Sequence, residues 1–142
     1  MQLNDLNERL LQATAAEDLV AASQCIGQGA QVNYVSPRQD SPLLVPIDTM
    51  NVALVQLLLD QGADPNPDPA RVYTLPLHAA VDVAVQAFLN EETEAISNET
   101  VELLVRYGAD FTRKDREGRN AADVALRYNS VARAYFERLP TP

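Results

Sequence analysis

Apolar residues recur at helical spacing before a glycine turn at three places along the chain. The central copy, residues 52–66, places four aliphatic side chains on one face of a predicted helix, namely Val52, Val55, Leu58 and Leu59. Gly62 then supplies the left-handed residue that closes a helix, and Pro65 prevents the helix from continuing. The same pattern recurs in residues 19–33 and 101–111. The chain is therefore predicted to be an array of repeated helical units.

The N-terminal segment predicts the first of these units. Its leucines at positions 3, 6, 10 and 11 follow helical spacing, and Asn4 or Asp5 can cap the start of the helix. A second helix is predicted over the alanine-rich stretch that follows, and it ends at Gly29. Cys25 stands in this helix at the position that leucine holds in the other copies, which predicts a small buried apolar residue rather than a reactive thiol.

The second unit is predicted to begin with a disturbed helix. Ser41 followed by Pro42 is a strong start signal, because a serine hydroxyl caps free N–H groups and proline fits the first helical position. Pro46 then removes a backbone donor inside the helix, which costs on the order of 3 kcal/mol where nothing compensates. We therefore expect a short or distorted helix here, with Asp48 or Thr49 capping the next one.

The third unit carries an insertion. Gly29 and Gly62 are 33 residues apart, whereas Gly62 and Gly108 are 46 apart, and the additional 13 residues fall between residues 81 and 97. Helical spacing continues as far as Leu89, which predicts that the first helix of this unit overruns by about two turns. An acidic loop is predicted to follow, with carboxylates at Glu91, Glu92 and Glu94.

The last unit is predicted to start at residues 115–120. Its final helix, over residues 130–139, presents Arg133, Glu137 and Arg138 where the earlier units carry aliphatic residues. A terminal unit has no further neighbour to bury that face, so polar residues are expected there.

Length and composition fit one folded domain. The 142 residues can remove roughly two-thirds of their unfolded surface from water, and 46% of them are apolar. No apolar run approaches the ~18 residues of a membrane span, and Asp5, Glu8 and Arg9 stand where a signal peptide would need apolar residues. One cysteine excludes an internal disulfide. A cytoplasmic protein without a membrane partner is expected.

Charge is unevenly distributed along the chain. The net charge is −9, with 15 acids and 3 bases in residues 1–104 and 5 acids and 8 bases in residues 105–142. An acidic body argues against nucleic acid or an anionic membrane as a partner and favours a basic one. The alternative is that the acidic residues provide only solubility.

The units also carry a family motif. Residues 75–80 read Leu-Pro-Leu-His-Ala-Ala, which differs at one position from T-P-L-H-x-A, and residues 41–46 and 120–125 are weaker copies. Together with the glycine closings and the 33-residue period, this motif resembles the ankyrin repeat family. The resemblance implies an all-α solenoid of stacked antiparallel helix pairs with projecting turns and a long insertion in the third repeat. It covers the chain as one domain with repeats at about 1–33, 34–66, 67–112 and 113–142.

The resemblance assigns local roles as well. His78 sits at the repeat's own histidine, which implies a structural ring whose nitrogens tie the turn to neighbouring backbone. Glu17 and Met50 stand where a glycine usually joins the two helices of a repeat, so those turns must differ or carry strain.

No motif points to catalysis, a metal or a cofactor. One histidine and one cysteine cannot assemble a zinc cluster, and no phosphate-binding loop, nucleophile elbow or metal-binding helix motif occurs. The acidic group of residues 91–99 lacks the glycine bend of a cation-binding loop. It is either a solvated loop or, as an insertion in an array, a segment that shapes partner recognition, and we favour the second interpretation.

Proteins that resemble the ankyrin family mostly hold other proteins with the concave face and the projecting turns. On this chain the resemblance implies turn tips at Tyr34, Arg38, Gln39, Asp68, Arg71, Tyr73, Arg113, Lys114 and Arg116. It implies exposed first-helix positions at Val45, Asp48, Thr49, Ala79, Asp82, Val124 and Arg127. Because tyrosine and arginine are enriched among binding hot spots, Tyr34, Arg71 and Tyr73 are the first candidates. The acidic loop completes the predicted surface.

A protein-binding module that acts by occlusion is the function that the resemblance implies. Small free-standing arrays of this kind are similar to bacterial ankyrin proteins, some of which are immunity proteins that neutralise a toxin. The acidic body would suit a basic toxin or effector such as a nuclease. The alternative is an adaptor that joins two proteins without inhibiting either. An enzyme, the third class, would require turnover that depends on His78.

Overall fold

A computed structural model describes residues 2–90 and 99–126 of the chain. Within these residues all regular structure is helical and no strand is present, so the expected all-α class is confirmed for this part. The helices described are α1 (Leu3–Ala15), α2 (Leu19–Gly27), α3 (Leu44–Asp48), α4 (Val52–Asp60), α5 (Pro76–Leu89), α6 (Glu99–Arg106) and α7 (Ala121–Leu126). The predicted acidic loop and the predicted final helix lie outside the described residues.

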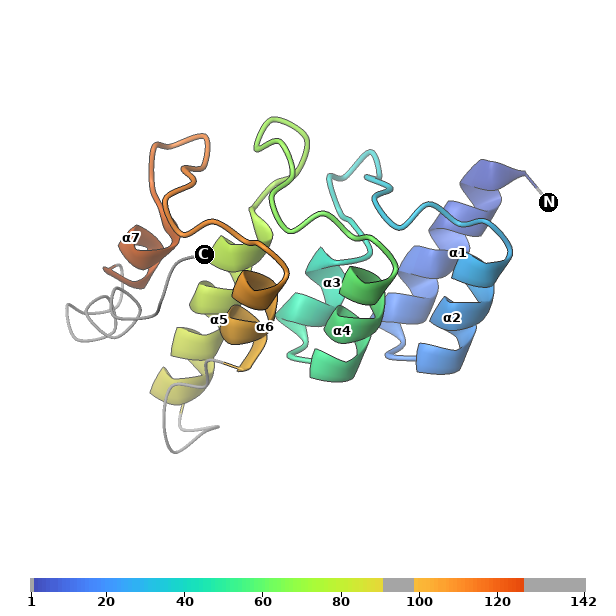
Figure 1. The fold of residues 1–142 in the computed structure, drawn as a ribbon, viewed down its shortest axis with the longest axis horizontal. Coiled ribbons are helices and arrows are strands. Elements are labelled where there is room, and N and C mark those ends of the chain that lie inside the picture. The colour runs from blue at the N-terminus through green and yellow to red at the C-terminus, as the bar shows by residue number, and fades with distance from the viewer. Residues whose placement is uncertain (1, 91–98, 127–142) are drawn as a thin grey trace.

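The helices form two rows along the long axis of the molecule (Figure 1). In the first row α1, α3, α5 and α7 pack one against the next, and in the second row α2, α4 and α6 do the same. Each second-row helix also packs against the first-row helix that precedes it in the sequence. Three long connections, residues 28–43, 61–75 and 107–120, project from the same edge of this slab.

Side-chain caps set where two second-row helices begin. Asp18 at the start of α2 and Asn51 at the start of α4 each accept the backbone N–H three residues further on, at 3.0 and 3.1 Å. Such a cap satisfies one of the N–H groups that a helix leaves free at its start. The prediction that Asp48 or Thr49 caps α4 is wrong, because Asp48 ends α3 and Asn51 follows the turn.

The first-row helices α1 and α3 begin in different ways. The Ser41 hydroxyl accepts the N–H of Leu44 at 3.3 Å, as the start signal predicts, but α3 begins at Leu44, so Pro42 precedes the helix and the prediction that it takes the first helical position is wrong. Pro46 lies in the middle of α3, which is only 5 residues long, so the expected short helix is confirmed. α1 already begins at Leu3, so Asn4 and Asp5 lie inside the helix and the prediction that they cap it is wrong.

Left-handed residues close the helices. Gly29, Gly62 and Gly108 have φ of +106°, +95° and +99°, as the three repeated closings predict. The same conformation occurs inside the first two helix pairs at Glu17 and Met50, with φ of 56° and 57°. A Cβ atom in this region costs roughly 1–2 kcal/mol, which confirms the predicted strain at these two turns.

Met50→Gly is expected to raise the free energy of unfolding by about 1 kcal/mol, because glycine adopts this conformation without the steric cost of a Cβ. Met50 is the better choice of the two, since the Glu17 carboxylate accepts a hydrogen bond from Asn51 at 3.2 Å. Urea denaturation measures the effect. Met50→Ala is the control, because it removes the same side chain and keeps the Cβ. A glycine variant no more stable than the alanine variant would contradict the strain.

Buried apolar residues fill the space between the two rows. The larger cluster joins α3, α4, α5 and α6 through residues that are at most 1% exposed, among them Ile47, Leu58, Val81, Val85 and Leu104. A smaller cluster joins α1 and α2 to α4 through Leu10, Ala22 and Leu54. Cys25 is only partly buried, which corrects the prediction, because α1 and α2 form the first pair and no described residue stacks on their outer side. Each pair thus depends on its neighbour for burial.

Asparagine side chains join successive connections. Asn33 donates to the carbonyl of Gly62 at 3.1 Å and accepts the N–H of Asp64 at 2.8 Å. Asn66 makes the equivalent two bonds to the third connection, at 2.8 and 2.9 Å. The sequence interpretation did not single out these residues, although each stands four positions after a closing glycine, a spacing that could have identified them. The clamps hold the connections side by side.

Candidate functional site

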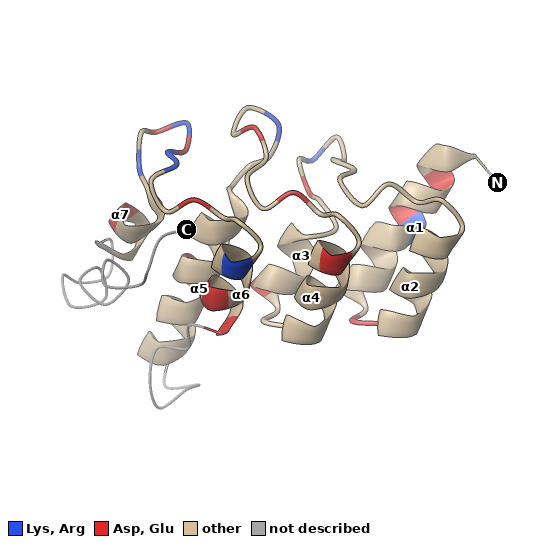
Figure 2. Cartoon of the chain, in the orientation of Figure 1, with Lys and Arg blue, Asp and Glu red and all other residues tan. Residues whose placement is uncertain are grey.

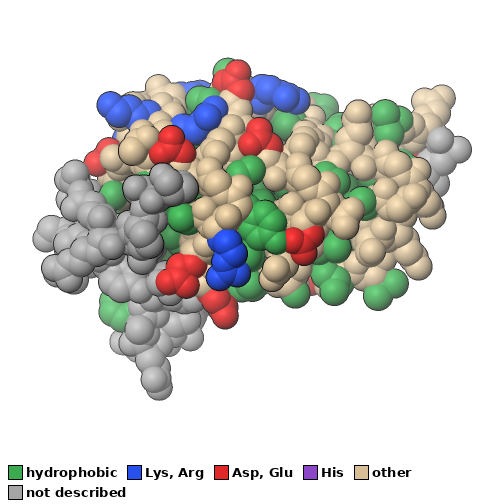
Figure 3. Space-filling model, viewed as in Figure 1, with side chains coloured by type: hydrophobic (Ala, Val, Ile, Leu, Met, Phe, Trp, Pro, Cys, Tyr) green, Lys and Arg blue, Asp and Glu red, His purple; other side chains and the backbone are tan. Residues whose placement is uncertain are grey.

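Cations gather on the projecting connections. Six of the eleven Lys and Arg residues of the chain lie there: Arg38, Arg71, Arg113, Lys114, Arg116 and Arg119. Figure 2 shows them as blue segments along the loops, and Figure 3 shows Lys and Arg side chains along the same edge of the surface. All of the predicted cationic tips are therefore on one edge, and Arg127, predicted as an exposed first-helix position, lies outside the described residues.

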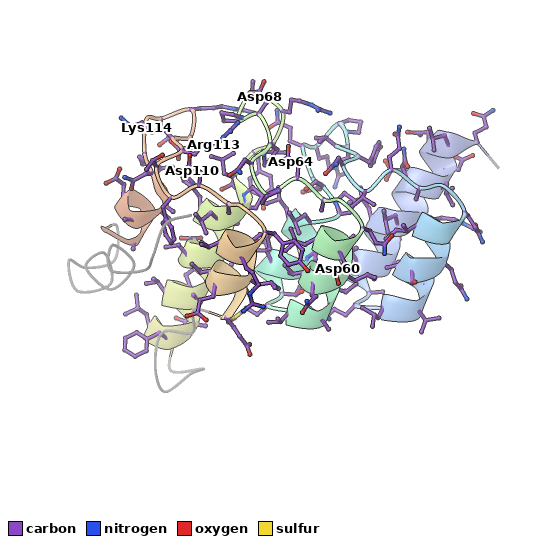
Figure 4. All side chains as sticks on the ribbon, in the orientation of Figure 1. Asp60, Asp64, Asp68, Asp110, Arg113 and Lys114 are labelled. Atoms are coloured by element: carbon purple, nitrogen blue, oxygen red, sulfur yellow. The ribbon has the colours of Figure 1, made fainter. Side chains whose placement is uncertain are left out.

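Two of these tip residues bind neighbouring connections. The Arg116 guanidinium donates to the carbonyls of Pro69, Ala70 and Val72 at 2.6, 3.1 and 3.1 Å, and to the side-chain oxygen of Gln39 at 3.2 Å. It therefore links all three connections although it is exposed. Arg113 similarly donates to the Pro67 carbonyl at 3.2 Å, and Figure 4 shows it between the second and third connections. These contacts fix the shape of the edge before any partner arrives.

Arg116→Lys is expected to speed amide hydrogen exchange in residues 36–40 and 69–73 by about tenfold, because an ammonium group cannot reproduce the fork of a guanidinium. Exchange in α4 should not change. Lys114→Ala is the matched control, since it removes a neighbouring cation that makes no hydrogen bond within the described structure. Mass spectrometry of the exchanged protein measures both variants. Equal exchange in the two variants would show that Arg116 does not hold the connections.

Other predicted tips are available to a partner. Arg38, Arg71 and Lys114 are exposed, one on each connection, and their side-chain cations make no hydrogen bond or ion pair within the described residues. Asp68 is also exposed and accepts the N–H of Ala70 at 2.9 Å within its own loop. Figure 4 places Asp68 and Lys114 at the outer ends of the second and third connections. The edge thus presents one uncommitted cation per connection.

We call the exposed surface of the first-row helices, together with the connection residues that border it, the inner face. At its centre the Tyr73 hydroxyl donates to the Asp48 carboxylate at 3.0 Å. These two residues were predicted separately, on a turn tip and on a first helix, and the structure brings them together. Tyr73 remains 51% exposed, which is unusual for a large aromatic side chain held by a hydrogen bond.

Negative charge surrounds this pair. Burial raises the pKa of Asp48, the hydrogen bond from Tyr73 lowers it, and the charges of Asp40 and Asp82 raise it again. Burial and then the charge of Asp48 raise the pKa of Tyr73 to about 12. The tyrosine is therefore neutral at physiological pH, and three carboxylates act on one small area of the inner face.

The inner face contains two clefts on either side of Asp48. The first, which we call the apolar cleft, has a volume of about 380 Å³ and is lined by Leu11, Ala15 and Val45 with Glu8, Arg38 and Asp40. The second, the acidic cleft, has a volume of about 240 Å³ and is lined mainly by Asp48, Tyr73, Thr74, His78, Asp82 and Asp115. Tyr34 stands near the first cleft, since its hydroxyl donates to Glu8.

His78 supports the wall of the acidic cleft. It is 3% exposed, and its Nε2 lies 2.7 Å from the carbonyl oxygen of Arg119 in the third connection. This is the tie to neighbouring backbone that the resemblance implies, made by one ring nitrogen. The other nitrogen, Nδ1, has no hydrogen-bond partner within the described structure. Burial lowers the pKa of His78, so the ring is kept neutral. A nitrogen committed to a carbonyl cannot act as a base.

Some predicted first-helix positions lie elsewhere than expected. Ala79 and Val124 are each only 4% exposed, so the prediction that they are exposed is wrong. The close packing of α5 against α7 removes both from solvent. Asp82 is partly exposed and accepts a hydrogen bond from Gln86 at 3.1 Å. Glu91, Glu92 and Glu94 lie outside the described residues.

In residues 2–90 and 99–126 no three His, Cys, Asp or Glu side chains are grouped so that they could hold a metal ion. None of the helices described there is long and apolar enough to cross a membrane.

Comparison with known proteins gives one similarity. No family model matches the chain. A stretch of 117 residues, 82% of this chain, is 27% identical to human Ankyrin repeat and SOCS box protein 11. The chain spans about a third of that protein, 32% of its length. This similarity suggests ankyrin repeats and a protein-interaction module, and it points away from an enzyme family.

Proposed function

We propose that this chain is an ankyrin-repeat solenoid of four units that binds another protein with its inner face and connections. The paired helices in two rows and the similarity to an ankyrin repeat protein support this proposal. The observation that carries it is the Tyr73–Asp48 pair: a half-exposed aromatic ring, held by a hydrogen bond at the wall of the acidic cleft. Buried aromatic anchors and the pockets beside them contribute most of the energy in protein interfaces.

Binding rather than catalysis follows from how the chemistry of the inner face is used. The one histidine is buried, and its Nε2 contacts the backbone carbonyl of Arg119, which gives the ring a structural role. The connections are already fixed by Asn33, Asn66 and Arg116, so a partner would meet a preformed surface and lose less entropy on binding. A cytoplasmic location, expected from the sequence, belongs to the same proposal.

The finer proposal is that the partner is basic and that binding inhibits it. The carboxylates around Asp48 give the inner face a negative potential, which attracts and orients a basic surface. A toxin or effector of the nuclease class would fit this description, with the chain as its immunity protein. Inhibition would then arise from occlusion of the basic surface.

Affinity capture with the full chain, followed by identification and purification of the captured protein, tests the proposal. We expect a 1:1 complex whose formation protects the inner face from amide hydrogen exchange. Deletion of residues 90–96 is expected to weaken the complex, because the acidic insertion is proposed to shape the same surface. A complex that leaves exchange at Tyr73 and Asp48 unchanged would show that another surface binds.

The adaptor function is distinguished by what the complex does. An inhibitor abolishes the activity of its captured partner, whereas an adaptor leaves it intact and recruits a second protein. Mixing the purified complex with the remaining captured proteins would reveal a ternary complex only in the second case. Turnover of a substrate by the chain alone would reject both.

A further inference from the structure

The two clefts of the inner face are neighbours along one helix. Val45 in the apolar cleft and Asp48 in the acidic cleft are three residues apart on α3, so they share a face of the helix one turn apart. Side chains at this spacing have Cβ atoms about 5–6 Å apart. A bound segment that reaches one cleft therefore passes directly beside the other.

The first cleft offers an apolar surface that remains open to solvent. Leu11 and Val45 are partly exposed and Ala15 is exposed, and they come from two different helices. Covering such aliphatic surface is favourable by about 25 cal/mol per Å² removed from water. An aliphatic side chain is the group that gains most from this cleft.

The charges around the clefts do not balance. Together the residues that line them include five carboxylates, at Glu8, Asp40, Asp48, Asp82 and Asp115, and two guanidinium groups, at Arg38 and Arg119. Arg119 is already paired with Asp115 at 3.0 Å and with Glu117 at 3.3 Å. Burial and the like charges of Asp40 and Asp82 raise the pKa of Asp48, and no cation of the described residues is paired with it. The acidic cleft is therefore complementary to a positive group.

We propose that the inner face binds a partner segment that carries an aliphatic side chain close to a lysine or arginine, with the aliphatic group in the apolar cleft and the cation between Asp48 and Asp82. The cation also lies beside the exposed ring of Tyr73, where a cation–π contact adds to the attraction. This inference rests on the proposed protein-binding function and names the chemistry of its partner.

The spacing on α3 sets the spacing in the partner. An extended segment advances about 3.3 Å per residue and its side chains alternate between two faces, so side chains two residues apart, about 6.6 Å, match the two clefts. In a helical segment the match is at three or four residues. The partner motif is thus an aliphatic residue and a basic residue separated by two to four positions.

A display library of random peptides of about twelve residues, selected on the purified full chain, tests this inference. Enrichment of peptides with an aliphatic and a basic residue at that separation is the expected result. The same peptides, resynthesised and titrated, should bind Asp48→Asn and Asp82→Asn at least about tenfold more weakly. Affinity should also fall as salt is raised, because the attraction is electrostatic. Peptides enriched for acidic residues, or no enrichment at all, would overturn the inference.

Matched variants separate the two clefts. Val45→Thr keeps the shape of the side chain and adds a hydroxyl, and Leu11→Gln repeats the test on α1 in case α3 is sensitive. Both variants should bind the selected peptides at least about fivefold more weakly, while their thermal unfolding temperature stays close to that of the wild type. Asp5→Asn is the charge control, because it removes the same charge from α1 at a position that lines neither cleft. Equal losses in Asp5→Asn and Asp48→Asn would reduce the effect to net charge and reject the site.

The outcome also distinguishes this inference from the proposed function. A captured protein that protects the inner face from exchange, yet binds Asp48→Asn and Val45→Thr as tightly as wild type, would reject the motif and leave protein binding intact. Absence of any captured protein would reject the function itself.

Discussion

His78→Ala is expected to lower the free energy of unfolding by about 2–4 kcal/mol, because it removes a buried ring and leaves the carbonyl of Arg119 without its donor. The two residues are 41 positions apart, so the bond joins α5 to the connection that leads into α7. Loss of this bond should loosen α7 first. Urea denaturation followed by circular dichroism measures the change.

His78→Gln is the companion variant, since its amide can still donate to the carbonyl of Arg119. It should recover part of the stability that alanine loses. A destabilisation below about 0.5 kcal/mol in the alanine variant would show that the ring is a passive filler.

The same histidine gives a pH dependence whose sign follows from its lowered pKa. Burial lowers the pKa of His78 below 6.5, the hydrogen bond to the Arg119 carbonyl and the charges of Asp115 and Asp123 raise it, and the charge of Arg119 lowers it. The unfolded chain therefore binds more protons than the folded one. The contribution of the neutral His78 ring to stability is complete above about pH 6.5. It is lost as the pH falls through the pKa of His78 in the folded protein.

Thermal unfolding at about pH 7.5 and about pH 5 checks this window. Wild type should lose stability relative to His78→Gln as the pH falls, because glutamine does not titrate. The pKa values of Asp110 and Asp115 lie below the ordinary 3.8. The protein therefore loses the stability that these two carboxylates contribute only at a lower pH than this window. Parallel pH profiles for the two proteins would contradict the interpretation.

The parts of the fold that the sequence predicted are those set by backbone chemistry. A glycine at positive φ and a proline within a helix act within a few residues, so Gly62 and Pro46 could be interpreted from their neighbours alone. The same is true of the strain at Met50. The overrun of α5 through Leu89 followed from helical spacing that continued beyond the usual period.

The errors concern contacts between units. Whether Ala79 is exposed depends on how closely α5 meets α7, and nothing in the sequence near Ala79 states that distance. Arg116 was chosen as a binding tip because it is a cation on a turn, but its donors face the carbonyls of the preceding connection. Asn51 rather than Asp48 or Thr49 caps α4 because the turn ends two or three residues later than expected. Local patterns therefore predicted the units better than the surface that the units form together.

Tyr73→Ala is expected to weaken binding of the captured partner by about 30-fold or more, equivalent to about 2 kcal/mol, and to change the free energy of unfolding by less than about 1 kcal/mol. Tyr73 is half exposed, so the fold loses little when the ring is removed, whereas the interface loses its aromatic anchor. His78 lies five positions away, and its substitution by alanine is expected to have a large effect on folding instead. Calorimetric titration measures the affinity for the partner, and urea denaturation measures the free energy of unfolding.

Tyr73→Phe and Tyr107→Phe form a matched pair for the role of the hydroxyl. Each tyrosine donates to a carboxylate, Tyr73 to Asp48 on the inner face and Tyr107 to Asp60 of the second-row helix α4. Figure 4 labels Asp60 on this helix. Tyr73→Phe keeps the ring and should lose only part of the affinity, because it frees Asp48 from the bond that orients it. Tyr107→Phe should bind as wild type does. If Tyr107→Phe bound the partner more weakly than Tyr73→Phe, the interface would lie on the second row and not on the inner face.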